Sequence, residues 1–190
     1  LVAPRPPKLC DGCPHIDSYT ALNEAMKSFP GGRVFSDIGC YTLGALPPFQ
    51  AIYSTVDMGA SITMAKGASE ADWLPSVAVI GDSTFTHSGM TGLLDCCVDN
   101  ANVTVIILDN GITGMTGSQK SSATGRIESI CTGLGVDPAH IRVINPLKKY
   151  FEENVAIMKE EIAYKGVSVI IPRRECIVAL NKRLKAAKKA

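Results

Sequence analysis

Two short polar motifs have residue types that can bind a metal ion. Gly81-Asp82-Ser83 directly follows an apolar stretch at residues 77–80, and Asp109-Asn110 follows a second one at residues 103–108. Continuous β-branched stretches are typical of buried parallel strands, and open α/β sheets bind ligands beyond the carboxyl ends of their strands. Carboxylate and amide oxygens suit Mg²⁺, in particular when the ion also holds a diphosphate. We therefore expect Asp82 and Asn110 to share one magnesium site.

Each motif also has a simpler interpretation. Asp82 alone can be a helix cap, and Asp109-Asn110-Gly111 alone can be an ordinary turn. Because both motifs occur together and both follow predicted strands, the pair favours the functional interpretation over the structural one.

Four of the seven cysteines form a second candidate site. Cys10 and Cys13 are separated by two residues, a spacing that can hold one metal ion or one corner of an iron–sulfur cluster. Cys40, in a glycine turn, and Cys176, after the last predicted strand, bring the thiolates to the four that a [4Fe–4S] cluster uses. A structural zinc ion and free thiols are the alternatives. The remaining three fall on predicted helices among apolar neighbours and are expected to be inert: Cys96, Cys97 and Cys131.

The elements that must position these residues alternate between helix and strand. Helices are predicted over residues 17–29, 60–70, 88–98, 127–134 and 148–164. Strands are predicted over residues 33–37, 77–80, 103–108, 141–144 and 167–171. This alternation predicts an α/β fold, a doubly wound and mainly parallel sheet with helices on both faces. The Gly-, Thr- and Ser-rich loop at residues 111–125 is long for a compact domain, which favours a functional loop.

Length and composition predict one large domain. The chain has 190 residues, 46% of them hydrophobic, which is enough for a full core. We expect a linker or arm at residues 1–9, the domain at 10–180, and a basic tail, either a frayed helix end or a linker, at 181–190. The net charge of +1 gives no support for nucleic acid as a partner, and no apolar stretch reaches the roughly 20 residues of a membrane span.

Cysteine content indicates the cellular compartment, and the first residue indicates whether the chain is part of a longer protein. Seven cysteines, an odd number, favour a reducing compartment, so we expect a cytoplasmic protein. No signal peptide is recognisable, and Leu1 in place of Met suggests a piece of a longer chain.

Together, the two polar motifs resemble the thiamine-diphosphate-binding signature, in which a Gly-Asp-Gly triplet precedes an Asn-Asn pair. Further motifs make nearly the whole chain similar to the diphosphate-binding domain of 2-oxoacid:ferredoxin oxidoreductases, and within that family to the large (alpha) subunit of the indolepyruvate branch. These motifs are Cys10-Asp11-Gly12-Cys13-Pro14-His15, Asp37-Ile38-Gly39-Cys40-Tyr41-Thr42, Met58-Gly59-Ala60-Ser61 and Asp109-Asn110-Gly111-Ile112-Thr113-Gly114-Met115-Thr116-Gly117. The chain departs from the general signature at Ser83, where Gly is usual, and at Asp109, where Asn is frequent. Neither side chain is an expected metal ligand.

The resemblance implies thiamine diphosphate and Mg²⁺ as cofactors. It assigns to Mg²⁺ the side chains of Asp82 and Asn110 and the backbone carbonyl of Ile112. A helix start at Ser88-Gly89 can offer free N–H groups to the phosphates. His87 lies just before this helix start and has two interpretations. It can hydrogen-bond the diphosphate or a reaction intermediate, which makes it the candidate catalytic residue, or it can be a structural histidine. The residues expected to contact the cofactor are Gly39, Cys40, Tyr41, Met58, Gly59, Ala60, Ser61, Gly81, Asp82, Ser83, His87, Asn110, Ile112, Thr113, Gly114, Met115 and Thr116.

For a complete enzyme, the resemblance implies oxidative decarboxylation of a 2-oxoacid, in this branch an aryl pyruvate such as indolepyruvate, to an acyl-coenzyme A, with electrons passing to ferredoxin. It also implies a [4Fe–4S] cluster on Cys10, Cys13, Cys40 and Cys176. Pyrimidine-binding and gamma-type domains or subunits must come from elsewhere in a dimer or larger complex, so we expect the isolated chain to bind the diphosphate weakly and not to turn over. The alternatives are a domain of a non-oxidative thiamine enzyme and a non-catalytic iron–sulfur or zinc interaction module.

Overall fold

A computed structural model describes residues 2–4 and 6–188 of the chain. Its α-helices are α1 (Pro14–Met26), α2 (Ala60–Glu70), α3 (Asp82–Thr84), α4 (Met90–Val98), α5 (Ile127–Gly133), α6 (Phe151–Ala163) and α7 (Ile177–Ala187). Its 3₁₀ helices are η1 (Cys40–Ala45), η3 (Pro138–His140) and η4 (Lys148–Tyr150), and η2 (Phe85–Gly89) is a π-helical turn. Its strands are β1 (Arg33–Ser36), β2 (Ser54–Thr55), β3 (Ser76–Gly81), β4 (Val103–Leu108), β5 (Ile112–Thr113), β6 (Gln119–Lys120), β7 (Ile141–Ile144) and β8 (Val167–Pro172).

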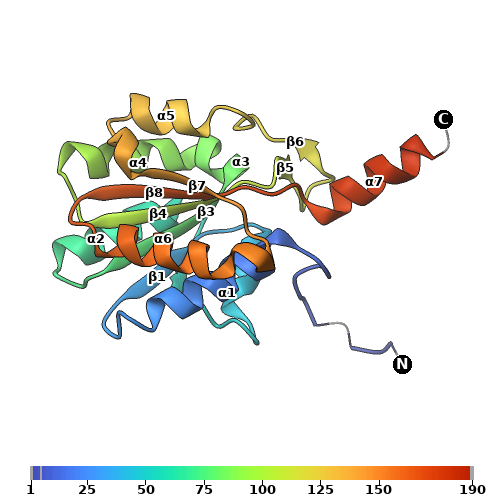
Figure 1. Ribbon diagram of the computed structural model, residues 1–190, viewed down its shortest axis with the longest axis horizontal. Helices are drawn as coiled ribbons and strands as arrows, with labels where there is room; N and C mark the ends of the chain where they lie inside the picture. The colour runs from blue at the N-terminus through green and yellow to red at the C-terminus, as the bar shows by residue number, and fades with distance from the viewer. Residues whose placement is uncertain (1, 5, 189–190) are drawn as a thin grey trace.

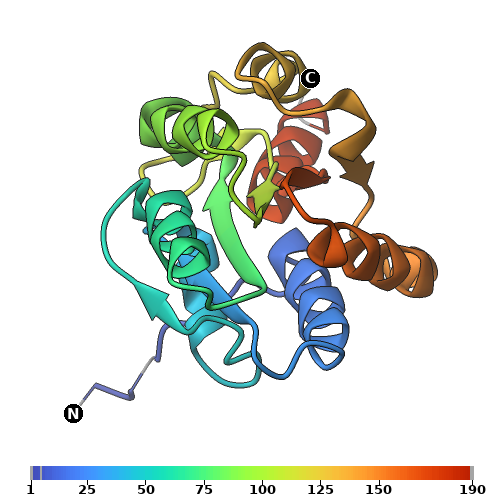
Figure 2. The ribbon, with the colours of Figure 1, turned by 90° about the vertical axis from the view of Figure 1, so that its left-hand side faces the viewer.

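Six of the strands form one sheet in the order β2-β1-β3-β4-β8-β7. Every pairing in this sheet is parallel. Helices lie on both sides of it (Figures 1 and 2). The predicted doubly wound parallel sheet is therefore confirmed, and the predicted ranges 60–70, 103–108 and 141–144 agree with the observed elements to the residue.

Alternation along the central strands creates two cores. Successive side chains of a strand point to opposite faces of the sheet. Ile107 accordingly belongs to the core that lies under α2, α4 and α5, whereas Ile106 belongs to the core that lies under α1 and α6. Both side chains are almost completely buried, so neither face of the central sheet is open to water.

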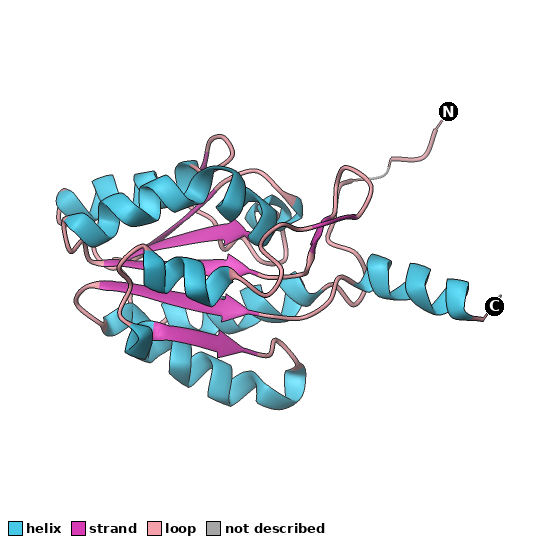
Figure 3. Ribbon diagram, turned by 90° about the horizontal axis from the view of Figure 1, so that it is seen from above, coloured by secondary structure: helices cyan, strands magenta, loops and turns pink. Residues whose placement is uncertain are grey.

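All the parallel strands end at the same edge of the sheet, which faces the β5–β6 hairpin and α7 (Figure 3). At this edge Gly81 of β3 is paired with Leu108 of β4, so Asp82 and Asp109 directly follow two hydrogen-bonded neighbours. The long loop after β4 is not irregular throughout, because Ile112 pairs with Lys120 in the antiparallel hairpin. The topology therefore brings the two polar motifs together.

Several boundaries differ from the predicted ones. α1 starts at Pro14, three residues earlier than expected, because proline fits the first helical position, where its missing N–H costs nothing. The basic stretch from Asn181 is helical as far as Ala187, since its Lys, Arg, Leu and Ala residues are good helix formers. Leu1 and Arg5 of the predicted arm and Lys189 and Ala190 of the predicted tail lie outside the described residues.

Within residues 2–4 and 6–188, no helix combines the length and the hydropathy that a bilayer crossing would need.

Candidate cofactor-binding site

A cavity of about 260 Å³ lies at the carboxyl edge of the sheet. Most of the residues expected to contact the cofactor line it, although they come from four separate parts of the chain. They are Gly39, Cys40, Tyr41, Met58, Gly81, Asp82, Ser83, Asn110, Ile112, Thr113, Gly114, Met115 and Thr116.

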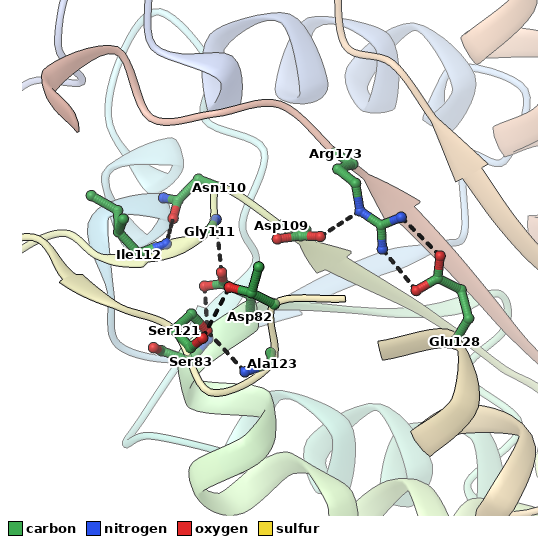
Figure 4. Close-up of polar contacts among 11 residues, drawn as sticks. Asp82, Ser83, Asp109, Asn110, Gly111, Ile112, Ser121, Ala123, Glu128 and Arg173 are labelled. Atoms are coloured by element: carbon green, nitrogen blue, oxygen red, sulfur yellow. Dashed lines mark hydrogen bonds and ion pairs between the residues drawn. The ribbon is translucent and has the colours of Figure 1, made fainter. Parts of the chain in front are cut away.

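Asp82 and Asn110 approach this cavity from the ends of β3 and β4. The Gly111 N–H donates to Asp82 Oδ2 over 2.9 Å, so the carboxylate is held against the loop that carries Asn110 (Figure 4). The N–H of Ser83 donates to the other carboxylate oxygen over 2.7 Å. The Ile112 N–H donates to Asn110 Oδ1 over 3.0 Å. Gly111 has a φ of +77°, a conformation that favours glycine, so this residue type is needed for the loop to turn back towards Asp82.

The electrostatics of Asp82 fit a bound cation. Its side chain is 2% exposed, and burial raises its pKa to about 7, with the charge of Asp109 adding to the effect. Hydrogen bonds from Ser83, Gly111 and Ser121 act in the opposite direction. A divalent cation would favour the ionised carboxylate and so remove much of this cost.

A buried Asp37–Tyr41 pair supports one wall of the cavity, and the sequence alone assigned Asp37 no role. The Tyr41 hydroxyl donates to Asp37, and Tyr41 lines the cavity. The Gly59 N–H and the Ser61 hydroxyl donate to the same carboxylate over 3.1 and 2.9 Å. The structure therefore places Gly59 and Ser61 behind the wall, and Ala60 likewise does not line the cavity.

The helical run after β3 begins earlier than predicted. α3, η2 and α4 follow one another without a break from Asp82, so Ser88 and Gly89 lie inside the run, and the prediction of a helix start there is wrong. The free N–H groups of a helix belong to its first turn, which here is Asp82–Thr84 at the cavity. His87 is exposed on the π-helical turn, with Nδ1 3.0 Å from Ser88 Oγ, and it does not line the cavity.

His15 is a wall residue for which the sequence left the role open. It is 3% exposed, and burial lowers its pKa to about 4, so it is neutral at pH 7. The Asn110 amide group donates to His15 Nε2 over 3.3 Å, which orients the amide. Its position two residues after Cys13 was the available signal. The other lining residues that the sequence did not indicate are Ile38, Thr84 and Leu108.

A smaller cavity of about 100 Å³ adjoins the first, and all four candidate cluster ligands line it: Cys10, Cys13, Cys40 and Cys176. Cys40, His15, Asn110 and Gly114 line both cavities. Burial raises the pKa of Cys13 to about 11, and the nearby thiols of Cys10, Cys176 and Cys40 contribute. The topology therefore gathers four thiols from distant parts of the chain into one place.

These thiols do not converge on one point. Among the described residues, no group of three or more His, Cys, Asp or Glu side chains is placed to hold a single metal ion. A tetrahedral zinc site needs such convergence, whereas in a [4Fe–4S] cluster the four thiolates bind four separate irons. The other cysteines have the apolar surroundings that the sequence predicted, since Cys96 and Cys131 are fully buried in the core and Cys97 packs against it.

Comparison with known proteins identifies the fold and the ligand class. The model of the family described as "Thiamine pyrophosphate enzyme, C-terminal TPP binding domain" matches residues 37–171; thiamine pyrophosphate is another name for thiamine diphosphate. The chain is similar to indolepyruvate oxidoreductase subunit IorA of Archaeoglobus fulgidus, with 37% identity over 92% of this chain and 29% of the relative. For IorA of Pyrococcus abyssi, the identity is 35% over 100% of this chain and 32% of the relative. The chain thus spans about a third of the length of these curated relatives.

Solved structures share the fold at low sequence identity. A 2-oxoglutarate:ferredoxin oxidoreductase from Magnetococcus marinus matches with a TM-score of 0.74 and 17% identity, over 92% of this chain and 66% of that one. Benzoylformate decarboxylase from Polynucleobacter necessarius matches with a TM-score of 0.58 and 14% identity, over 83% and 33%. With the family model covering residues 37–171 and the predicted motifs lining one cavity, this chain belongs to the thiamine-diphosphate-binding domain family of thiamine diphosphate enzymes.

Proposed function

We propose that this chain is the thiamine-diphosphate- and Mg²⁺-binding domain of a 2-oxoacid:ferredoxin oxidoreductase. The observation that carries the proposal is the position of Asp82 and Asn110, which line one cavity and are linked through the Gly111 N–H. Asp82, Asn110 and the backbone carbonyl of Ile112 would hold Mg²⁺ together with oxygens of the diphosphate.

When bound, the cofactor supplies a carbon nucleophile and an electron sink for the 2-oxoacid. The residues of this chain bind and orient it. The N–H groups of the first turn at Asp82–Thr84 that are not bound to the Asp82 carboxylate would face the diphosphate, and the Asp37-held ring of Tyr41 fixes one wall. Met58, Leu108 and Met115 contribute apolar side chains to the lining of the cavity.

The second cavity supports an electron-transfer role. A [4Fe–4S] cluster would be held by Cys10, Cys13, Cys40 and Cys176. Cys40 lines both cavities, so its side chain would lie between the cluster and the cofactor. This arrangement favours an oxidative enzyme over a non-oxidative one, which needs no cluster. The shared fold does not distinguish the two classes, since benzoylformate decarboxylase also has it.

The names of the relatives support a more specific assignment of the substrate and the electron acceptor. We propose an aryl pyruvate such as indolepyruvate as substrate, with coenzyme A as acyl acceptor and ferredoxin as electron acceptor. The pyrimidine-binding and gamma-type domains would be supplied by the rest of a dimeric or larger complex, since the chain corresponds to about a third of its relatives. All seven cysteines are unpaired, which supports a cytoplasmic location.

The cofactor assignment is tested with Asp82→Ala in the complete protein. We expect Mg²⁺-dependent thiamine diphosphate binding, measured by calorimetry, to fall by at least about 100-fold, because a carboxylate ligand and its charge are lost. Asp95→Ala, which removes an exposed carboxylate on α4, is the matched control and should bind as the wild type does. Equal binding by Asp82→Ala and the wild type would favour the non-catalytic module.

The cluster assignment is tested by anaerobic purification. We expect about four iron and four sulfide per chain at this site, with loss of both on Cys176→Ser but not on Cys97→Ser. Retention of full iron and sulfide content by Cys176→Ser would contradict the assignment.

A further inference from the structure

The residue just before Asn110 is a buried carboxylate with a partner directly after β8. Asp109 is 6% exposed, and its Oδ2 accepts a hydrogen bond from Arg173 Nε over 2.6 Å. Asp109 occupies the position at which the thiamine-diphosphate signature frequently has Asn. The chain therefore carries a negative charge at this position that an Asn would not bring, and it needs a countercharge because a buried unpaired carboxylate is costly.

The guanidinium of Arg173 bridges two carboxylates. While Nε contacts Asp109, Nη1 and Nη2 donate to the two carboxylate oxygens of Glu128 in α5, each over 2.8 Å (Figure 4). These hydrogen bonds raise the pKa of Arg173 further, so it remains charged. The planar fork thereby links the end of β4 to α5 in one fixed geometry.

Backbone hydrogen bonds also hold the Asp109-Asn110 pair against the segment that follows β8. The Asp109 N–H donates to the Pro172 carbonyl over 3.1 Å, and the Arg174 N–H donates to the Asp109 carbonyl over 3.0 Å. The Cys176 N–H donates to the Asn110 carbonyl over 3.1 Å. The segment after β8 therefore aligns the Asp109-Asn110 pair beyond the end of the regular sheet, and Arg173 adds the side-chain bond to this alignment.

The Asp109 carboxylate does not line the cavity, but its charge acts on Asp82. It contributes to the raised pKa of Asp82, so the two carboxylates repel each other, and a bound diphosphate would add further negative charge. Arg173 is the cation that contacts Asp109 directly.

We propose that Arg173 is a positioning residue of the Mg²⁺–diphosphate site, which fixes Asp109 and thereby Asn110, and offsets the negative charge behind Asp82. The inference rests on the proposed function and adds a residue that does not line the cavity. It accounts for Asp109 at a position where the thiamine-diphosphate signature frequently has Asn. Arg173, held by Glu128, supplies the positive charge that the Asp109 carboxylate needs.

The test is a double-mutant cycle on the complete protein with Arg173→Met, Asp109→Asn and the double variant. Calorimetry measures the affinity for thiamine diphosphate at fixed Mg²⁺, and urea unfolding measures the stability of the ligand-free protein. Arg173→Met should weaken binding on the order of tenfold, because it leaves the Asp109 charge unpaired beside the site. Adding Asp109→Asn should recover at least about fivefold, since the unpaired charge is then gone.

Arg183→Met is the matched control. Arg183 pairs with Glu175 in the same part of the chain but is exposed, and its loss should not change the affinity. If Arg173→Met does not fold, Arg173→Lys keeps the charge without the fork and should still weaken binding about threefold or more.

Two results would overturn the inference: wild-type affinity in the Arg173 variants at reduced stability, or no recovery in the double variant. A wild-type protein that binds no thiamine diphosphate would instead defeat the proposed function itself, and the inference with it.

Discussion

Asp82 illustrates how a single functional residue can oppose folding. Its carboxylate is buried at the end of β3, and burial raises its pKa to about 7 from the usual 3.8. Two backbone N–H groups offset part of this cost. The residue is thus held in a state that is unfavourable for the ligand-free protein and favourable for cation binding, a balance expected where function competes with stability.

This balance predicts a pH-dependent stability. Because the folded-state pKa of Asp82 is raised, its contribution to stability is fully present below pH 3.8 and is lost as the pH rises through about 7. The free energy of unfolding of the wild type minus that of Asp82→Ala should therefore be larger at pH 5 than at pH 8, by up to about 3 kcal/mol. Urea unfolding of both ligand-free proteins at the two pH values measures this difference. A difference that does not change with pH would show that Asp82 titrates normally in the fold.

Among the elements, the turn that starts α2 depends on the helical run after β3. Gly59 precedes α2 with a φ of +96°, and a Cβ at this position would lie 2.4 Å from Ser88 Oγ. The Ser88 hydroxyl in turn donates to the Met58 carbonyl over 2.9 Å. The π-helical turn therefore fixes the segment that carries Met58, a wall residue of the cavity.

A methyl group at Gly59 should disturb this contact. Gly59→Ala combines a left-handed backbone with a steric clash, so we expect it to destabilise the protein by about 1–3 kcal/mol. Gly67→Ala in the middle of α2 is the control, because a methyl group there would meet nothing within 4 Å and the φ of Gly67 is not positive. The control should be neutral or slightly stabilising, by up to about 1 kcal/mol. Thermal and urea unfolding measure the stability of both variants. Equal stabilities would contradict the proposed dependence of the Gly59 turn on its contact with Ser88.

Over the whole molecule, the two cavities share a wall built from three distant segments of the chain. His15, Cys40, Asn110 and Gly114 line both cavities, and a Cβ on Gly114 would lie 3.1 Å from Cys40 Sγ. The first cavity therefore has four wall residues that also border the cysteine cavity. The proposed cofactor and the proposed cluster would therefore lie close together, as electron transfer between them requires.

The shared wall predicts a pattern of thiol reactivity in the cluster-free protein. Mg²⁺ and thiamine diphosphate should slow alkylation of Cys40, because it lines the cofactor cavity, and should leave exposed Cys10 unaffected. Cys96 and Cys131 should stay unmodified at pH 8 with or without ligand, since burial raises the pKa of each to about 12. Mass spectrometry after timed iodoacetamide labelling measures all four sites. Unchanged labelling of Cys40 in the presence of bound cofactor would refute the shared wall.

The sequence alone determined the order of the elements and the identity of the metal-site candidates. Buried parallel strands are locally encoded as apolar β-branched stretches, so residues 103–108 were predicted to the residue, and the polar residues that end such strands must meet at one edge. Gly59, Ala60 and Ser61 were also recognised as a motif, although the structure does not bring them to the cavity wall.

Tertiary packing decided where the helical run after β3 begins and which side chains contact one another around the site. The helical run starts at Asp82 rather than Ser88, and it includes Phe85, which is not a strong helix former but is fully buried in the core. Examples of these contacts are that of buried His15 with Asn110 and the bridge from Asp109 through Arg173 to Glu128, which join residues 45 to 95 positions apart. Burial and charge pairing of this kind arise only when the chain is folded, so local sequence patterns could at most mark His15 by its position after Cys13 and did not reveal these contacts.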